Sequence, residues 1–273
     1  MRLESIDKYL DDQGRQFRVT LHDVIDSTNK EAKRIARRSS SSDNMVIIAD
    51  AQTEGRGRRD HAFFSPDGSG IYMSFLTRLG NGLTAADSTY LMPLTAAAAA
   101  EAIKDISGRE AGIKWVNDIM IEGKKVAGIL IEGLFSENAA DTVISGIGIN
   151  VFEPESGFPE DISESAGAVF RESGGSRRVE DIRERLSAEV INRFARLYLE
   201  FAATRDSSGL MEKYRSMSAI IGKEVTVNGA ENERVWTAVA EEIDDECHLI
   251  VRNKSGERVY LSSEEISIKL KDI

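Results

Sequence analysis

The hydrophobic pattern of the chain changes near residue 220. Before that point, apolar runs of strand length alternate with longer stretches in which apolar residues recur at helical spacing. After residue 223, short runs alternate apolar and polar residues, and turn residues separate them. Closely spaced short strands of this kind are typical of a small β-barrel. The pattern therefore predicts an α+β domain over residues 1–220 and a β-barrel domain over residues 221–273.

The individual elements follow from the same periodicity. Strands are predicted at 17–21, 46–49, 71–77, 113–118, 124–132 and 142–149, and helices at 3–10, 26–35, 85–106, 179–201 and 210–217. The acidic segment 153–178 contains two prolines and is predicted to be a surface loop. The C-terminal strands are predicted around Val225 and Val227, Val235 to Val239, Leu249 and Val251, Val259 and Leu261, and Ile266 to Leu270, with turns at Asn228-Gly229, Asp244-Asp245 and Ser255-Gly256.

Composition narrows the class of protein. The chain has 273 residues, 41% of them hydrophobic, and a formal net charge of −11. This charge disfavours general binding to nucleic acid or anionic membranes, so an anionic substrate must be held by a local basic cluster. The single cysteine, Cys247, excludes a disulfide framework and a multi-cysteine metal site. Because the first residues include acids and no apolar run, we expect no signal peptide or membrane anchor, and a cytoplasmic protein.

The segment Gly55-Arg56-Gly57-Arg58-Arg59 carries the densest candidate chemistry. Guanidinium groups are always ionised and offer a fork of donors that matches phosphate and carboxylate. Glycine lets an anion approach the backbone closely. The segment therefore has the features of an anion clamp. By itself, however, it fits a solvated loop or a nucleic-acid patch at least as well.

Three further segments place polar residues or glycines beside predicted elements. Asp26-Ser27-Thr28-Asn29 is suited to cap a helix, and the same groups can form a small polar cradle. Lys125 directly precedes an apolar strand, so its ammonium can be held over a pocket, although paired lysines at turns usually face solvent. Gly146 and Gly148 either let a ligand lie against the backbone or mark a bulge.

Taken together and in this order, the motifs resemble those of biotin–protein ligases. The matching segments are Asp26-Ser27-Thr28-Asn29, Gln52 with Gly55–Arg59, Ser65-Pro66, Lys114-Trp115-x-Asn117-Asp118, Lys125-x-Ala127-Gly128-Ile129-Leu130-x-Glu132 and Gly146-x-Gly148-Ile149-Asn150. The resemblance covers about Ser27 to Asn150, with a small β domain following as in the family. It implies a mixed central β-sheet flanked by helices, similar to class II aminoacyl-tRNA synthetases, and an SH3-like C-terminal β-barrel.

The resemblance also implies an activity. Family members join biotin and ATP into biotinyl-5′-adenylate and then transfer biotin to one lysine of a biotin carboxyl carrier domain of a carboxylase. In the first step the carboxylate of biotin must approach the α-phosphate of ATP, so cations are needed to offset the repulsion of two anions. The expected catalytic residues are Lys125, which bridges carboxylate and phosphate, Arg58, which holds the adenylate phosphate, and Lys114, which assists beside Mg²⁺.

Residue by residue, the resemblance assigns a biotin site, a nucleotide site and a metal ligand. The expected biotin-binding residues are Ser27, Thr28, Asn29, Gln52, Gly55, Arg56, Lys125, Gly128, Ile129 and Gly146. The expected nucleotide-binding residues are Arg58, Arg59, His61, Phe63, Asn117 and Asn150. Asp118 is the expected ligand of Mg²⁺. Catalysis in such a site rests mainly on positioning and charge stabilisation.

The chain departs from the family pattern after Arg59. Asp60, His61 and Phe63 stand where the family usually has Gly, Arg and Trp, and Val116 replaces the usual Pro. We therefore expect weaker retention of biotinyl-adenylate. Two alternatives stay open: a lipoate or octanoate ligase, which shares the fold and the acyl-adenylate chemistry, and a biotin-binding regulator with impaired turnover.

Many bacterial members of the family also bind operator DNA through an N-terminal helix-turn-helix domain. About two dozen residues precede the first motif here, whereas such a domain needs about sixty. We therefore expect a short form that lacks the DNA-binding domain and has no nucleic-acid partner. Family members often dimerise through sheet edges, so the resemblance is compatible with a homodimer.

Overall fold

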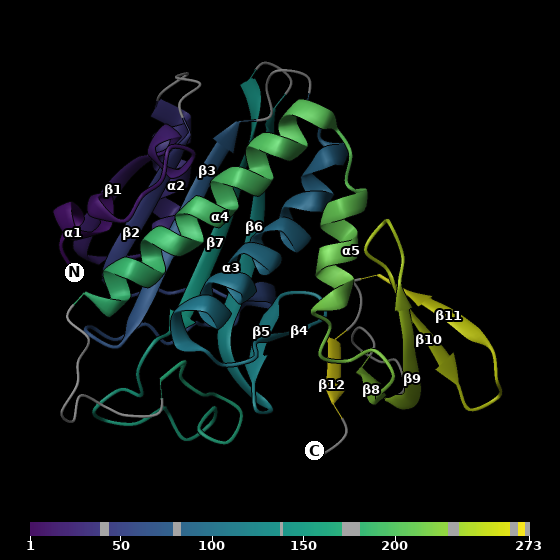
Figure 1. The fold of residues 1–273 in the computed structure, drawn as a ribbon. Coiled ribbons are helices and arrows are strands. Elements are labelled where there is room, and N and C mark those ends of the chain that lie inside the picture. The colour runs from purple at the N-terminus through teal and green to yellow at the C-terminus, as the bar shows by residue number, and fades with distance from the viewer. Residues whose placement is uncertain are drawn as a thin grey trace.

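A mixed β-sheet forms the framework of the N-terminal part. The structure is a computed structural model and describes residues 1–38, 44–78, 83–136, 139–170, 181–228, 235–262 and 267–270. Within these residues the sheet has seven strands in the order β1-β2-β3-β7-β6-β5-β4 (Figure 1). They are β1 (Arg18–Ile25), β2 (Met45–Gln52), β3 (Gly70–Arg78), β4 (Gly112–Lys114), β5 (Asp118–Ile121), β6 (Lys124–Ser136) and β7 (Ala139–Asn150). β1 and β2 are parallel, and the other neighbouring strands are antiparallel.

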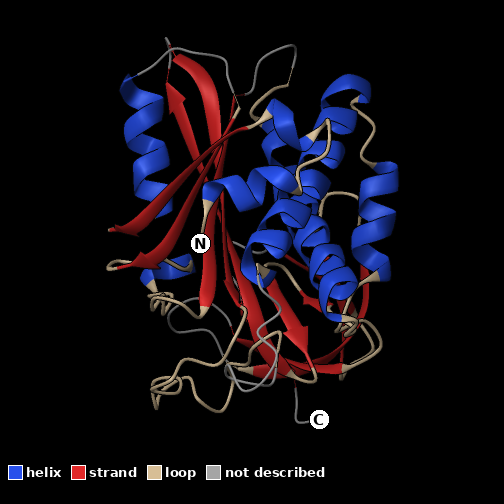
Figure 2. Ribbon diagram, turned by 60° about the vertical axis from the view of Figure 1, so that its left-hand side comes forward, coloured by secondary structure: helices blue, strands red, loops and turns tan. Residues whose placement is uncertain are grey.

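Helices cover both faces of this sheet (Figure 2). The helices are α1 (Leu3–Lys8), α2 (Thr28–Arg38), α3 (Leu91–Ser107), α4 (Ile182–Thr204) and α5 (Ser208–Ser216), and the 3₁₀ turns are η1 (Gly14–Gln16), η2 (Arg58–Asp60) and η3 (Ala86–Tyr90). α2 packs on one face, where Met45 and Ile47 of β2 are buried, and α3 and α4 pack on the other, where Val46 and Ile48 are buried. Burial on both faces explains why β2 is a continuous apolar run in the sequence.

Small and aromatic side chains bring the helical layer close to the sheet. The alanines 96–100 of α3 are buried, which allows a close approach to the strands. Phe194 of α4 stacks on Phe75 of β3 with ring centroids 3.7 Å apart, and Phe17 meets both rings edge-on. The helix predicted over residues 85–106 begins instead as the turn η3, and the α-helix proper runs from Leu91 to Ser107.

A second, antiparallel sheet forms the C-terminal part. Within the described residues its strand order is β11-β10-β9-β8-β12. The strands are β8 (Glu224–Asn228), β9 (Trp236–Ile243), β10 (Leu249–Asn253), β11 (Arg258–Leu261) and β12 (Ser267–Leu270). An α+β fold with a separate C-terminal β unit confirms the predicted fold class. The division at residue 220 stays a prediction.

The side chains of β9 that are buried differ from those expected from the sequence. Val235 and Val239 are exposed, at 65% and 43%, whereas Ala238 and Ala240 are buried. Val225 of β8 pairs with Ala238, and cross-strand partners share a face of the sheet. Val239 of β9 therefore points to solvent because the core face is set by the pairing with β8, and Val235, just before the strand, is exposed as well.

Other differences are local. β5 is a separate strand where the sequence indicated only a polar turn, and residues 151–170 contain neither helix nor strand. The predicted turn at Asn228-Gly229, the predicted loop over 171–178 and the predicted start of a strand at Ile266 reach residues outside those described. Among the helices that the structure describes, none is long and apolar enough to cross a bilayer.

The two parts meet at the segment between β4 and β5. The indole of Trp115 donates to the carbonyl of Cys247 at 3.0 Å, and the hydroxyl of Tyr214 on α5 donates to the carbonyl of Val116 at 2.9 Å. In Figure 1, α5 lies between the helical layer and the C-terminal strands. The segment that leads to Asp118 is thus held by α5 and by the C-terminal part.

Candidate active site

A cavity of about 430 Å³ opens at the N-terminal end of α2, beside the loop that follows β2. Residues of β6 and β7 also line it. Most residues assigned from the sequence lie in its wall: Ser27, Thr28, Asn29, Gln52, Arg56, Arg58, Arg59, His61, Phe63, Asn117, Asp118, Lys125, Gly128, Ile129 and Gly146. The fold therefore gathers segments that lie far apart in the sequence around one space.

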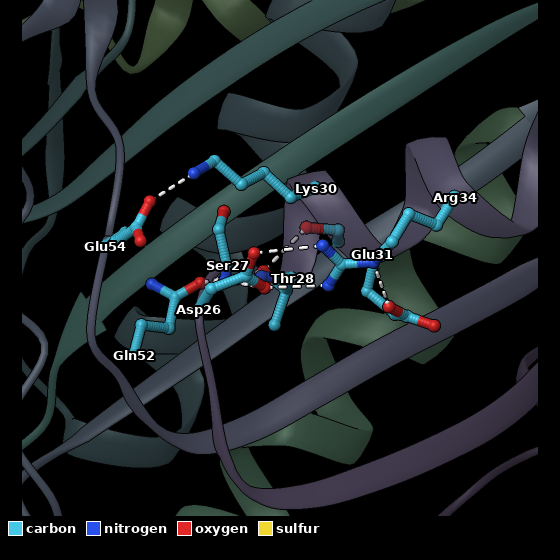
Figure 3. Close-up of polar contacts among 9 residues, drawn as sticks. Asp26, Ser27, Thr28, Lys30, Glu31, Arg34, Gln52 and Glu54 are labelled. Atoms are coloured by element: carbon cyan, nitrogen blue, oxygen red, sulfur yellow. Dashed lines mark hydrogen bonds and ion pairs between the residues drawn. The ribbon is translucent and has the colours of Figure 1, made fainter.

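The start of α2 forms a polar cradle with the end of β2. The N–H and the hydroxyl of Thr28 both donate to Gln52 Oε1, at 2.9 and 3.1 Å (Figure 3). Gln52 Nε2 donates to Ser65 Oγ at 3.0 Å, and this hydroxyl donates to the carbonyl of Phe63 at 2.8 Å. Both ends of the Gln52 amide are thus fixed by the protein itself.

Ser74 of β3 extends this network, and our sequence reasoning missed it. Its fully buried hydroxyl lies 2.7 Å from Thr28 Oγ1 and 2.5 Å from Asn29 Oδ1. Asn29 Nδ2 in turn donates to Glu132 Oε2 at 2.8 Å. A continuous chain of hydrogen bonds therefore runs from Glu132 on β6, through α2 and β3, to the carbonyl of Phe63. A single serine in an apolar strand carries no sequence signal of such a role.

Asp26 braces the cradle from outside the cavity. Arg34 donates to its two carboxylate oxygens at 2.7 and 2.9 Å, and Asp26 Oδ1 also accepts the N–H of Ser27 at 2.7 Å (Figure 3). The hydrogen bonds from Arg34 outweigh burial and lower the pKa of Asp26 to about 2. On the same helix, Lys30 forms an ion pair with Glu54, the residue before Gly55.

The arginine loop, Gly55–Arg59, folds back on the residues that follow it. Gly57 N–H donates to the carbonyl of His61 at 2.7 Å, and Phe63 N–H donates to the carbonyl of Gly55 at 3.0 Å. A Cβ on Gly55 would lie 2.3 Å from the carbonyl oxygen of Phe63. Only glycine fits at this position, because backbone on both sides fixes the separation.

Two arginines connect the loop to residues on other segments. Arg56 Nη1 donates to Glu132 Oε1 at 3.1 Å. Arg58 Nη1 donates to Asn117 Oδ1 at 3.3 Å, and Asn117 Nδ2 donates to the carbonyl of Ile129 at 3.0 Å. The loop therefore spans the cavity from the end of β2 to β6 and to the segment before β5.

Lys125 and Asp118 form the charged end of the cavity. Lys125 Nζ lies 2.6 Å from Asp118 Oδ1, and Lys114 Nζ lies 3.8 Å from Asp118 Oδ2. The buried Oδ1 of Asp118 accepts no bond of hydrogen-bond geometry from any residue that the structure describes. Lys125 is thus close enough for electrostatic attraction but is not aligned as a donor. One carboxylate faces two ammonium groups.

Phe63 supplies an apolar wall next to these polar groups. A Cβ on Gly148 of β7 would lie 2.5 Å from its ring, so the absence of a side chain there makes room for the ring. Tyr72 meets the ring edge-on at a centroid distance of 6.4 Å. The cavity therefore has a flat aromatic face on the side of the central strands.

Three assigned residues, Gly55, Lys114 and Asn150, are not among the lining residues. Gly55 shapes the loop, and Lys114 reaches Asp118 from β4. Asn150 Nδ2 donates to the carbonyl of Gly167 at 3.0 Å and so ties the end of β7 to a later segment.

Comparison with known proteins connects this cavity to a family. Residues 21–150 match the model of the Biotin/lipoate A/B protein ligase family, and residues 220–269 match that of the Biotin protein ligase C terminal domain. The biotin–[acetyl-CoA-carboxylase] ligase of Paracoccus denitrificans is 31% identical over 249 residues, which are 88% of this chain and 96% of that protein. The chain belongs to the biotin–protein ligase family. All the residues assigned to the site lie within the first of these matches.

Two more relatives extend the likeness. The bifunctional ligase/repressor BirA of Bacillus subtilis is 37% identical over 153 residues, which are 56% of this chain, and the match spans 46%, about half, of that protein. The solved structure of the biotin protein ligase from Aquifex aeolicus in complex with biotin and ATP superposes with a TM-score of 0.74 at 25% identity. That superposition covers 93% of this chain and 99% of the Aquifex chain.

Proposed function

We propose that the chain forms biotinyl-5′-adenylate from biotin and ATP and transfers biotin to one lysine of a biotin carboxyl carrier domain. The observation that carries this proposal is the single cavity in which Lys125, Arg58 and the Thr28–Gln52 cradle meet. The names of the relatives point to the same chemistry.

In the first half-reaction, a carboxylate oxygen of biotin attacks the α-phosphorus of ATP, and the bond to pyrophosphate breaks. Two anions must approach within a few ångströms, and their repulsion is several kcal/mol at intermediate dielectric. Lys125 would lie between them, and Arg58 would hold the phosphate that remains. Because both cations already border the cavity, the site is organised for this charge before the substrates arrive.

The polar cradle would bind the ureido group of biotin. Ser27, Thr28 and Asn29 supply hydroxyl and amide groups, and Gln52 is already held in one orientation. A hydrogen bond made there contributes about 0.5–1.5 kcal/mol, whereas a buried group left unpaired costs about 1–3 kcal/mol. An acyl substrate without a ureido group would therefore be discriminated against. Backbone near Gly128, Ile129 and Gly146, with Arg56 above it, would enclose the rest of biotin.

The nucleotide would extend from Lys125 along the arginine loop. We assign Arg59 and His61 to the phosphates, Asn117 to the ribose–phosphate side and Phe63 to stacking on adenine. The Asn150 amide nitrogen is bonded to Gly167, so its Oδ1 is the atom we assign to the adenine amino group. Phe63 offers less stacking area than Trp, and Asp60 and His61 replace Gly and Arg, so we propose weaker retention of the adenylate. A dissociation rate as slow as that of relatives with the usual loop would refute this.

The residues at the charged end fit a Mg²⁺ ion. Within the described residues, no three His, Cys, Asp or Glu side chains gather around one point. Mg²⁺ usually binds one or two carboxylates together with substrate phosphates and water. Asp118, whose buried Oδ1 accepts no hydrogen bond from the described residues, suits this role. When bound, the ion would neutralise the departing pyrophosphate, and Lys114 would assist from β4.

We also propose a cytoplasmic homodimer without a DNA-binding activity. β1 is the edge of the large sheet, and within the described residues its outer side has no partner strand. Val24 on this strand is 62% exposed. A monomeric mass by light scattering at working concentration would exclude the dimer, and a sequence-specific shift of operator DNA would exclude the proposed lack of a DNA-binding activity.

Incubation of the chain with ATP, Mg²⁺, biotin and a biotin carboxyl carrier domain tests the proposed activity. One lysine of the carrier should gain the mass of biotin less one water. Excess lipoate should leave the yield unchanged. Transfer of lipoate in place of biotin would favour the lipoate ligase alternative. Tight biotin binding without any mass gain would favour the non-catalytic regulator.

A further inference from the structure

We propose that Glu132 is the positioning residue that holds Arg56, and with it the arginine loop, over the cavity. Its effect on catalysis rests on the proposed function, but the anchoring itself does not. Glu132 does not line the cavity and was noted from the sequence only as part of a motif.

The carboxylate of Glu132 joins three separate segments. It accepts Asn29 Nδ2 at 2.8 Å, Arg56 Nη1 at 3.1 Å and Lys33 Nζ at 2.6 Å. Asn29 and Lys33 lie on α2, Arg56 lies on the loop, and Glu132 lies on β6. Because β6 belongs to the central sheet, this carboxylate ties Arg56 of the loop both to the sheet and to α2.

The charges around Glu132 favour its ionised form. Burial alone would raise the pKa of Glu132, but the hydrogen bonds from Lys33 and Asn29 and the charges of Lys33 and Arg56 hold it below its ordinary value. At neutral pH, one carboxylate therefore faces two cations. Removing its charge would leave Lys33 and Arg56 close together without this counter-charge.

The ion pair between Lys30 and Glu54, the residue just before the loop, is a weaker anchor. The side chains of Lys30 and Glu54 are 35% and 60% exposed, whereas those of Arg56 and Glu132 are 34% and 17% exposed. Exposed ion pairs contribute little because solvent screens them and long side chains lose entropy. Of these two ion pairs, the one between Arg56 and Glu132 should therefore restrain the loop more, and it would leave Arg58 and Arg59 as the arginines that meet the phosphates.

Hydrogen–deuterium exchange of the ligand-free protein tests the anchoring independently of any activity. The amides of Gly57, His61 and Phe63 donate within the loop and report its opening. Glu132→Gln keeps the shape of the side chain but removes its charge. We expect these amides to exchange about tenfold faster in Glu132→Gln, which corresponds to about 1.4 kcal/mol. Arg56→Gln should give the same acceleration, and Glu54→Gln, a matched loss of one charge, should have little effect.

The double variant separates anchoring from general support of α2. If Glu132 acts through Arg56, Glu132→Gln should cause no further acceleration in an Arg56→Gln background. An equal acceleration in that background, or unchanged exchange in both single variants, would overturn the proposal. In the same proteins, biotin should dissociate about tenfold faster from either single variant. If the wild-type chain forms no biotinyl-adenylate, the proposed function fails while the exchange result still decides the anchoring.

Discussion

Three carboxylates near the cavity, Asp26, Asp118 and Glu132, each lie within ion-pair distance of a basic side chain. A chain with a net charge of −11 thereby keeps a cluster of cations in place where an anionic substrate would enter. Asp26 acts on the start of α2, Glu132 on the arginine loop, and Asp118 on the two lysines. At this scale, each acidic residue fixes the position of a basic one.

The lowered pKa of Asp26 predicts how the free energy of unfolding depends on pH. Since the pKa falls from 3.8 to about 2 on folding, the ionised form is favoured in the folded state. The stabilisation is complete above about pH 4 and is lost as the pH falls toward 2. Asp26→Asn should therefore lower the free energy of unfolding by about 1–2 kcal/mol at pH 7. Urea denaturation at several pH values should show the difference from wild type shrinking below pH 4. A difference independent of pH would contradict the assignment.

The two lysines next to Asp118 should differ in importance. Lys125 lines the cavity, whereas Lys114 does not. Lys125→Met should reduce the rate of adenylate formation by about 10²–10³-fold, as for loss of a main charge-stabilising group. Lys114→Met, which removes the same charge, should reduce it by about tenfold or less. Pyrophosphate release measures both rates, and equal losses would show that the two roles are not distinct.

Among the elements, the arginine loop depends most on backbone packing. Its turn is closed by the bonds from Gly57 to His61 and from Phe63 to Gly55, and a side chain, Arg56, ties it to β6. Each end of the loop is thus fixed by the chain itself, so the loop can cover the cavity without a ligand.

Two glycine substitutions in this loop should have unequal effects. A Cβ on Gly55 would lie 2.3 Å from a backbone oxygen, whereas on Gly57 the nearest atom is 3.2 Å away. Gly55→Ala must therefore displace backbone and should raise the KM for biotin by at least about tenfold, a loss of about 1.4 kcal/mol. Gly57→Ala should change it only a few-fold. Steady-state kinetics with circular dichroism as the folding control would test this order, and the reverse order would contradict the described loop.

The sequence predicts the strands of the large sheet and the main helices because apolar periodicity is strong in them. It does not predict β5, which is a four-residue strand beside a polar turn, or the buried face of β9, which is set by pairing with β8. The motifs of the sequence do identify most of the residues that line the cavity. The sequence does not reveal Ser74 or the anchoring contacts of Glu132, because these depend on segments that meet only in the folded chain.

For the whole molecule, the contacts that α5 and the C-terminal part make with the segment before Asp118 matter most. Trp115 reaches the carbonyl of Cys247, and Tyr214 reaches that of Val116. The C-terminal β unit, through Cys247, and α5, through Tyr214, thus support the segment that leads to Asn117 and Asp118.

Loss of the hydrogen bond from Tyr214 should lower the free energy of unfolding and raise the KM for ATP. Tyr214→Phe leaves the carbonyl of Val116 without this donor in a buried place, which costs about 1–3 kcal/mol. The KM for ATP should rise several-fold while the KM for biotin stays nearly constant, because only the segment before β5 is loosened. Urea denaturation and separate substrate titrations measure the two effects. An equal rise in both KM values would show that the whole site is loosened and would contradict this assignment.

The bonds that lead from Glu132 through Asn29, Ser74, Thr28 and Gln52 to Ser65 have a consequence for how this site could change in evolution. Each residue of this chain forms hydrogen bonds with the residues next to it. Replacing any one of them by an apolar residue therefore leaves a neighbouring polar group without its hydrogen-bond partner. A change of substrate specificity would therefore require substitutions at several of these positions together, and most of the single substitutions would be harmful. Because these positions depend on one another, we expect substrate specificity to change more slowly in evolution than the protein surface.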